Sequence, residues 1–316
     1  MNSGHSRKLL SLAVLILCSC AARREAPQNT PEGQYTFASA EDAADALKTA
    51  VAGRDRQELL HIFGANAGEL LSSGDDDADK ERAAFIAARM AERTEVVQVG
   101  GGLEGQPAAV LIIGEARWPL PIPLVVERGR WRFDTALGRQ EILNRRIGAN
   151  ELMVLALCRD YVRAQREYAE AGYNGGAYAD RFFSTPGKKD GLFWEPRAGQ
   201  PRSPIGPFAA KAADEAYVRT AFGAAAPYHG YYYRILTRQG PNARFGAKNY
   251  ITQGGLRGGF ALLAYPAKWD ESGAMTFITG PDGIIYEKNL GRETPQIAAK
   301  IASFDPDASW RPAIGE

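Results

Sequence analysis

Histidine, the side chain best suited to proton transfer near neutral pH, is scarce in this sequence, which holds three among 316 residues. His229 stands in the run Tyr228-His229-Gly230-Tyr231-Tyr232-Tyr233-Arg234, and Asp270 and Glu271 occupy a segment predicted to be a loop. If the fold brings His229 within hydrogen-bond reach of Asp270 or Glu271, the pair has the residue types for general acid–base catalysis. We favour the alternative, in which alternating tyrosines form two faces of a strand, His229 caps its start and the acids are solvated.

Other motifs with a defined chemistry are missing from the sequence. It contains no HExxH, no paired CxxC and no GxSxG, so it gives little support to metal or serine-hydrolase chemistry, and we expect no metal and no cofactor. Gly100, Gly102 and Gly105 have the spacing of a dinucleotide-binding loop, which must open onto a helix. Here they lead to Pro107 and a β-branched run, which predicts a hairpin loop instead.

Aromatic residues suggest a second kind of site. Trp194, Tyr231, Tyr233 and Trp269 are candidates to line a groove for a sugar or a peptide, because aromatic rings supply a large contact area with a polar edge. The alternative is that these rings pack inside the protein. Cys158 lies alone in an apolar helical segment, where we expect it to pack as a small hydrophobic residue.

The first residues have the features of a bacterial export signal. A basic start precedes an apolar core, Leu9 to Leu17, that is too short to span a membrane. Leu17-Cys18-Ser19-Cys20 then resembles a lipoprotein box, with Cys20 as the lipidated residue, although ordinary secretory cleavage one or two residues later is the alternative. Ala21 after the lipidated cysteine resembles lipoproteins sent to the outer membrane. We therefore expect an outer-membrane lipoprotein that faces the periplasm, with residues 1–20 as signal peptide and 21–34 as a flexible tether.

Length and composition limit the architecture of the remainder. The length predicts two domains, and a formal net charge of +1 gives no support to nucleic-acid binding. Residues 35–137 read as helices followed by an antiparallel meander, an element order like that of cystatin or nuclear-transport-factor-like (NTF2-like) domains. Residues 138–316 read as a long helix followed by an antiparallel sheet, so the expected fold class is α+β in two domains.

The helix predicted over Gly138 to Gly172 organises the second domain. Apolar residues recur along it at spacings of three, four or seven and share one face. Leu152 to Cys158 is apolar all round, so we expect this segment to be covered on several sides. The weak helix formers Gly148 and Asn150 leave a kink or a division open. Further along, Pro281-Asp282-Gly283 between two β-rich runs predicts a tight hairpin.

Several segments carry a family resemblance: NELMVLALCRDYVRAQREYA, DGLFW, SPIGP, PYHGYYYRIL, GGFALLAYPAKWDESGAMTFI and DGIIYEKNLG. They resemble the bacterial DUF2950 proteins over most of residues 135–295, and the family name records no assigned function. The long helix followed by a sheet also resembles the globular part of type IV pilins and pseudopilins. A pilin, however, exposes an apolar helix at its N-terminus, whereas this helix is internal and follows a lipoprotein-like leader, so we carry over the topology and not pilus assembly.

These patterns favour a non-catalytic cell-envelope lipoprotein that binds or scaffolds another envelope component, a protein or a polysaccharide, through its second domain. The membrane is contacted through the lipid anchor, and no nucleic acid is expected. The alternative is a small, hydrolase-like envelope enzyme that uses His229 with Asp270 or Glu271.

Overall fold

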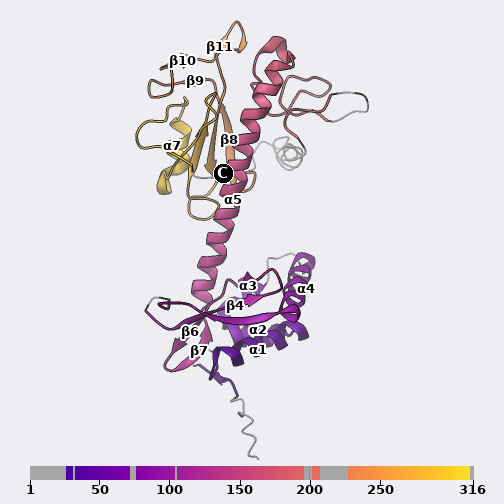
Figure 1. Cartoon of the computed structure of the whole chain (residues 1–316), viewed down its shortest axis with the longest axis vertical. Coiled ribbons are helices and arrows are strands. Elements are labelled where there is room, and N and C mark those ends of the chain that lie inside the picture. Colours follow the sequence, from indigo (N-terminus) through magenta and orange to yellow (C-terminus); the bar gives the residue numbers. More distant parts are fainter. Residues whose placement is uncertain are drawn as a thin grey trace, which may run out of the picture. The chain divides into compact units, whose positions relative to one another are not determined.

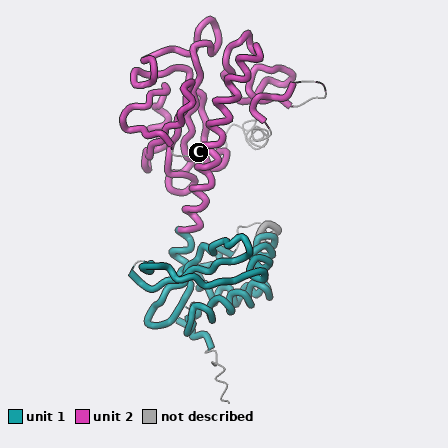
Figure 2. Tube along the Cα trace, viewed as in Figure 1, with its two compact units in different colours: residues 1–140 teal, residues 141–316 magenta. Residues whose placement is uncertain are grey.

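A computed structural model describes residues 26–30, 33–71, 76–103, 105–195, 199, 201–206 and 227–313. The leader with Cys20, and a helix expected over Ala209 to Phe222, lie outside the described residues. The chain divides into two compact units, Met1–Gln140 and Glu141–Glu316 (Figure 2). Helices and antiparallel sheets occur in both, which confirms the α+β class. Within the described ranges, no helix is both long and apolar enough to cross a membrane.

The first unit begins with short strands and helices. Its helix α1 starts after Ser39, whose side chain accepts a hydrogen bond from the backbone N–H of Asp42, as expected of an N-cap. The elements are β1 (Gln28–Asn29), β2 (Tyr35–Thr36), α1 (Ala40–Gly53), α2 (Arg56–Phe63), η1 (Ala65–Ala67), α3 (Gly68–Leu71) and α4 (Asp76–Glu92).

An antiparallel sheet completes the first unit, in the order β3-β4-β6-β7 with β5 paired to β4. Its strands are β3 (Thr94–Gln98), β4 (Ala108–Ile113), β5 (Trp118–Pro119), β6 (Leu124–Glu127) and β7 (Arg130–Phe133). Strands β5 and β6 are separate, because the prolines between them lack the N–H that a continuous ladder needs. Gly102 lies in the β3–β4 hairpin at φ 72°, so the glycine-rich segment is a hairpin loop, as predicted.

The long helix α5 (Thr135–Glu170) starts slightly earlier than predicted. The Asp134 carboxylate accepts hydrogen bonds from the backbone N–H groups of Ala136 and Leu137, which caps the helix there. Helix α5 is continuous through Gly148 and Asn150.

Most of the apolar run of α5 is buried, with Leu152 as the exception. Leu155 and Cys158 are buried at 6 % and 0 % exposure, but Leu152 is 66 % exposed. The expectation of cover on several sides was therefore wrong for Leu152. The packing follows the helical period, because a sheet covers a single stripe of a helix.

The second unit is built around an antiparallel sheet in the order β16-β15-β14-β13-β8. Its strands are β8 (Tyr231–Leu236), β13 (Ala261–Pro266), β14 (Thr276–Thr279), β15 (Ile285–Lys288) and β16 (Arg311–Pro312). Helix α5 covers one face, where Leu262 and Phe277 join its core. Helix α7 (Thr294–Lys300) flanks the opposite face, where Leu263 and Ile278 pack with Ala298 (Figure 1).

Short hairpins and turns complete this unit. Strands β9 (Arg238–Gln239), β10 (Lys248–Asn249) and β11 (Ile251–Thr252) lie together at one end of it (Figure 1), and β12 (Gly255–Leu256) pairs with β11. The short turns are η2 (Tyr173–Gly176), whose Gly175 carbonyl accepts a hydrogen bond from Arg257, and η3 (Gly291–Glu293). In the hairpin between β14 and β15, Gly283 has φ 79° and its N–H donates to the Gly280 carbonyl. This confirms the predicted tight turn, in which glycine accepts a positive φ that other residues adopt at a cost.

Candidate functional site

His229 lies in the tight turn that leads into β8. The backbones of Tyr228 and Tyr231 hydrogen-bond each other in both directions, and the two residues between them, His229 and Gly230, have φ of 46° and 72°. Positive φ at both positions is what a type I′ hairpin turn requires. The exposed imidazole packs edge-on against the Tyr228 ring, with centroids 4.3 Å apart. His229 is thus a turn residue with an accessible ring.

Asp270 and Glu271 lie on the neighbouring loop, and both are exposed. The two segments are adjacent, because the Ala267 N–H donates to the Gly230 carbonyl at 2.8 Å. Glu271 pairs with Lys268 at 3.2 Å. In the part of the chain that the structure describes, no hydrogen bond or ion pair joins His229 to either carboxylate. The fold therefore brings the segments of the catalytic hypothesis together without forming the acid–base pair.

Glu151, which the sequence did not single out, makes the densest polar contacts at this place. Its Oε1 accepts hydrogen bonds from the N–H groups of Ala274 and Met275, each at 2.9 Å, and from the Tyr231 hydroxyl at 3.3 Å. Burial, and then the Glu151 charge, raise the pKa of Tyr231, which keeps its hydroxyl protonated as a donor. These contacts fasten α5 to the loop before β14. No local pattern points to them, because the partners lie 80 to 124 residues from Glu151 in sequence.

An open hollow of about 400 Å³ lies beside the same loop. It is lined by Lys268, Trp269, Asp270, Glu271, Arg292 and Pro295. The Trp269 indole N–H donates to the Asn289 side-chain oxygen at 2.9 Å, which fixes the ring at the rim. A fixed aromatic ring among charges of both signs suits a polar ligand with an apolar face. We call this set of lining residues the Trp269 hollow.

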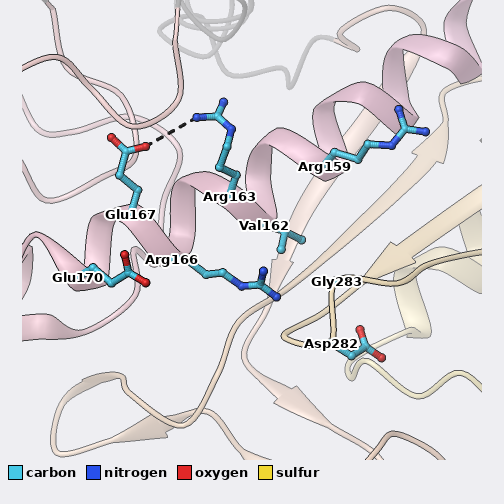
Figure 3. Close-up of a pocket in the computed structure, with 8 residues that line it drawn as sticks. All are labelled: Arg159, Val162, Arg163, Arg166, Glu167, Glu170, Asp282 and Gly283. Atoms are coloured by element: carbon cyan, nitrogen blue, oxygen red, sulfur yellow. Dashed lines mark ion pairs between the residues drawn. The ribbon is translucent and has the colours of Figure 1, made fainter. Parts of the chain in front are cut away.

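A larger hollow, of about 520 Å³, lies along α5. Figure 3 shows Arg159, Arg163 and Arg166 projecting from the helix, with Asp282 on the hairpin opposite. Arg163 pairs with the helix carboxylates of Asp160 and Glu167, at 2.9 and 3.7 Å.

Part of this charge has a structural role. Arg166 donates to the Pro281 carbonyl at 3.0 Å, which ties the hairpin to α5. Burial raises the pKa of Asp282, so the hairpin carboxylate is poorly solvated there. The larger hollow is therefore a weaker candidate for a site than the Trp269 hollow.

The other candidate aromatic residues face the interior. Trp194 is 7 % exposed, and its indole N–H donates to the Pro201 carbonyl at 3.0 Å. Tyr231 is fully buried, and Tyr233 is half-buried with a hydroxyl that has no hydrogen-bond partner among the described residues. Trp194 and Tyr231 thus follow the alternative interpretation, in which the rings pack inside. Trp269, by contrast, lies at a surface hollow.

The described residues give little support to metal or thiol chemistry. No group of three or more histidine, cysteine, aspartate or glutamate side chains suited to a metal ion occurs among the described residues. Cys158 is buried, as expected, and burial raises its pKa to about 12. A thiol of that pKa stays protonated at neutral pH and is a poor nucleophile.

Comparison with known proteins agrees with the resemblance and extends it. No curated protein and no solved structure matches the chain. One family model, described as "Protein of unknown function (DUF2950)", matches residues 34–313. The match includes the first unit as well as the segments that carry the resemblance. The chain therefore belongs to the DUF2950 family.

Proposed function

We propose that this protein is a non-catalytic envelope lipoprotein, held at the outer membrane by lipid on Cys20 and facing the periplasm. The support is the leader: a basic start, an apolar core of signal length and a lipoprotein-like box ending at Cys20. Several acyl chains anchor a protein stably, because each buried methylene contributes about 0.8 kcal/mol. Cys20→Ala is expected to abolish acyl labelling and release the protein from membranes, and labelling that persists would refute the anchor.

The second unit, in this proposal, binds another envelope component at the Trp269 hollow. The observation that carries it is the fixed Trp269 ring at an open hollow whose rim holds Lys268 and Arg292 as well as Asp270 and Glu271. An open hollow gives a polymer access along its length, whereas a small substrate is usually enclosed. A polysaccharide or a peptide segment fits best, because either offers an apolar face to the ring and polar groups to the rim.

Capture from detergent-solubilised envelope tests this binding role. The full acylated chain is used as bait, in the wild-type form and as Trp269→Ala. The matched control is Trp118→Ala, which removes a surface tryptophan, 38 % exposed, from the first unit. We expect Trp269→Ala to lose a partner that Trp118→Ala retains. Equal capture by both variants would refute the hollow as the binding site. Turnover of a captured polymer that disappears in His229→Ala would instead support the enzymatic alternative.

We also propose that the two compact units are separate domains, like a cystatin or NTF2-like domain and a pilin-like domain in their element order. In support, each unit has its own apolar core: Leu47, Leu111 and Phe133 belong to one, and Tyr161, Leu262 and Phe277 to another. The order of a long helix followed by an antiparallel sheet supports the pilin-like comparison. Separate thermal transitions in calorimetry are expected, and one joint transition would argue against two domains.

A further inference from the structure

Phe245 is the most exposed large apolar side chain among the described residues, at 88 %. It lies between β9 and β10 at φ 73°. A bulky residue with a positive φ is a true outlier, which costs stability and persists only where the surrounding structure holds it. An aromatic ring held in solvent at such a cost buries little apolar surface within the fold, so its exposure points to a ligand.

The backbone on both sides of Phe245 is held by hydrogen bonds from a buried side chain. The Gln239 side-chain amide donates to the carbonyls of Arg244 and Gly246, the two neighbours of Phe245, at 2.8 and 2.6 Å. Its oxygen accepts from the buried Tyr250 hydroxyl at 2.8 Å. Gln239 itself is only 8 % exposed, so these bonds are shielded from competing water. The outward position of Phe245 is therefore built into the fold.

The charged side chains of the segment that carries Phe245 are all basic. Residues 237–259 carry four basic side chains and no acidic one. All four basic residues are exposed: Arg238, Arg244, Lys248 and Arg257. The Arg244 guanidinium lies over the Phe245 ring, 4.9 Å from its centroid. Two carboxylates lie on neighbouring segments: Asp305 accepts two hydrogen bonds from Asn242, and Asp282 interacts electrostatically with Arg244. The sum of these charges is positive, because the basic side chains outnumber the two carboxylates.

A second exposed apolar residue lies on the same group of hairpins. Ile251 in β11 is 48 % exposed, and β9, β10 and β11 lie together at one end of the second unit (Figure 1). We define the basic tip as Phe245 and Ile251 with the four basic side chains of residues 237–259. Apolar side chains among cations are typical of surfaces that lie on anionic membranes. The cations draw the surface to the headgroups, and the apolar side chains enter the interface.

We propose that the basic tip docks on an anionic lipid surface, with the Phe245 ring inserted among the headgroups. A soluble acidic polymer would engage mainly the cations, whereas a lipid surface also takes up the exposed apolar side chains of Phe245 and Ile251, so the lipid explains more of the structure. This contact is distinct from the lipid on Cys20 and does not rest on the Trp269 hollow. It gives the second unit a membrane contact of its own.

Co-sedimentation with vesicles tests the proposal. The full chain carries Cys20→Ser in every sample, so that acylation is absent and any contribution of the leader is common to all. The vesicles are phosphatidylcholine with or without phosphatidylglycerol. We expect preferential binding to the anionic vesicles, reduced roughly tenfold by Phe245→Ser, since burial of most of an aromatic side chain is at stake. Arg244→Gln and Lys248→Gln are each expected to reduce it roughly fivefold.

The matched control is Phe85→Ser in α4, because Phe85 is 57 % exposed and also lies beneath an arginine, Arg89, at 5.5 Å. It is expected to leave binding unchanged, and circular dichroism checks that both serine variants are folded. Equal effects of Phe245→Ser and Phe85→Ser would overturn the proposal, as would equal binding to neutral vesicles. Loss of binding in the Arg244 and Lys248 variants but not in Phe245→Ser, with competition by soluble polygalacturonate, would identify an acidic polymer as the ligand instead of lipid.

Discussion

Replacing Leu155 by alanine removes methyl groups from the interface between α5 and the five-stranded sheet of the second unit. Leu155 is 6 % exposed, so the substitution both loses apolar burial and leaves a cavity. Such substitutions in protein cores cost about 2–5 kcal/mol. That is a large share of the roughly 5–15 kcal/mol that stabilises a typical domain.

Leu152 provides a matched control on the same helix and within the same apolar run. It is the same residue type, three positions earlier, but 66 % exposed. Leucine and alanine both favour helix, so Leu152→Ala is expected to change the free energy of unfolding by no more than about 0.5 kcal/mol. Any difference between the two variants therefore reports burial and not helix propensity.

Urea titration of the full chain measures both variants, and hydrogen exchange at the β13 amides assigns the change to the second unit. We expect Leu155→Ala to lower the urea midpoint and to speed exchange in β13, and Leu152→Ala to do neither. If both variants were equally mild, the second unit would not be built around α5. If both were equally damaging, the exposure of Leu152 would be wrong.

Three further predictions follow from single contacts. Gly283→Val forces a bulky residue to φ 79° and is expected to destabilise the folded protein by about 1–2 kcal/mol. Gly148→Ala, in a helix with open space around it, is expected to stabilise the protein, and thermal melting compares the two variants. Glu151→Leu leaves the N–H groups of Ala274 and Met275 without their acceptor and is expected to cost about 1–3 kcal/mol of unfolding free energy. Glu151→Gln keeps an oxygen there and is expected to cost less; an equal cost in urea titrations would refute a stabilising role for these hydrogen bonds. Burial raises the pKa of Cys158 from 9.0 to about 12, so the folded state loses stability relative to the unfolded state as pH rises from about 9 towards 12. At neutral pH, labelling of the Cys158 thiol by maleimide is expected to require unfolding, and rapid labelling of the folded chain would contradict this.

The sequence by itself determined the elements whose signals are local. The apolar period of residues 138–172 predicted α5, since side chains three and four apart share a helical face whatever packs on it. The tight turn at Pro281-Asp282-Gly283 was predicted because proline and glycine restrict or free their own backbone. Strand β8 (Tyr231–Leu236) forms where the alternating tyrosines predicted a strand, because β-rich composition next to turn residues is also a local signal.

Only the tertiary structure decided which of these residues are covered and which are offered to a ligand. Leu152 and Leu155 have the same chemistry in the same run, but Leu155 is buried in the core of the second unit and Leu152 is exposed. The partners of Glu151 come from β8 and the segment entering β14, at separations that no local pattern encodes. Trp194 and Trp269 likewise looked alike in sequence, yet one packs in the core and the other stands at a hollow. The physical reason is the same throughout: a side chain's type sets what it is able to contact, and the approach of distant segments sets what it does contact.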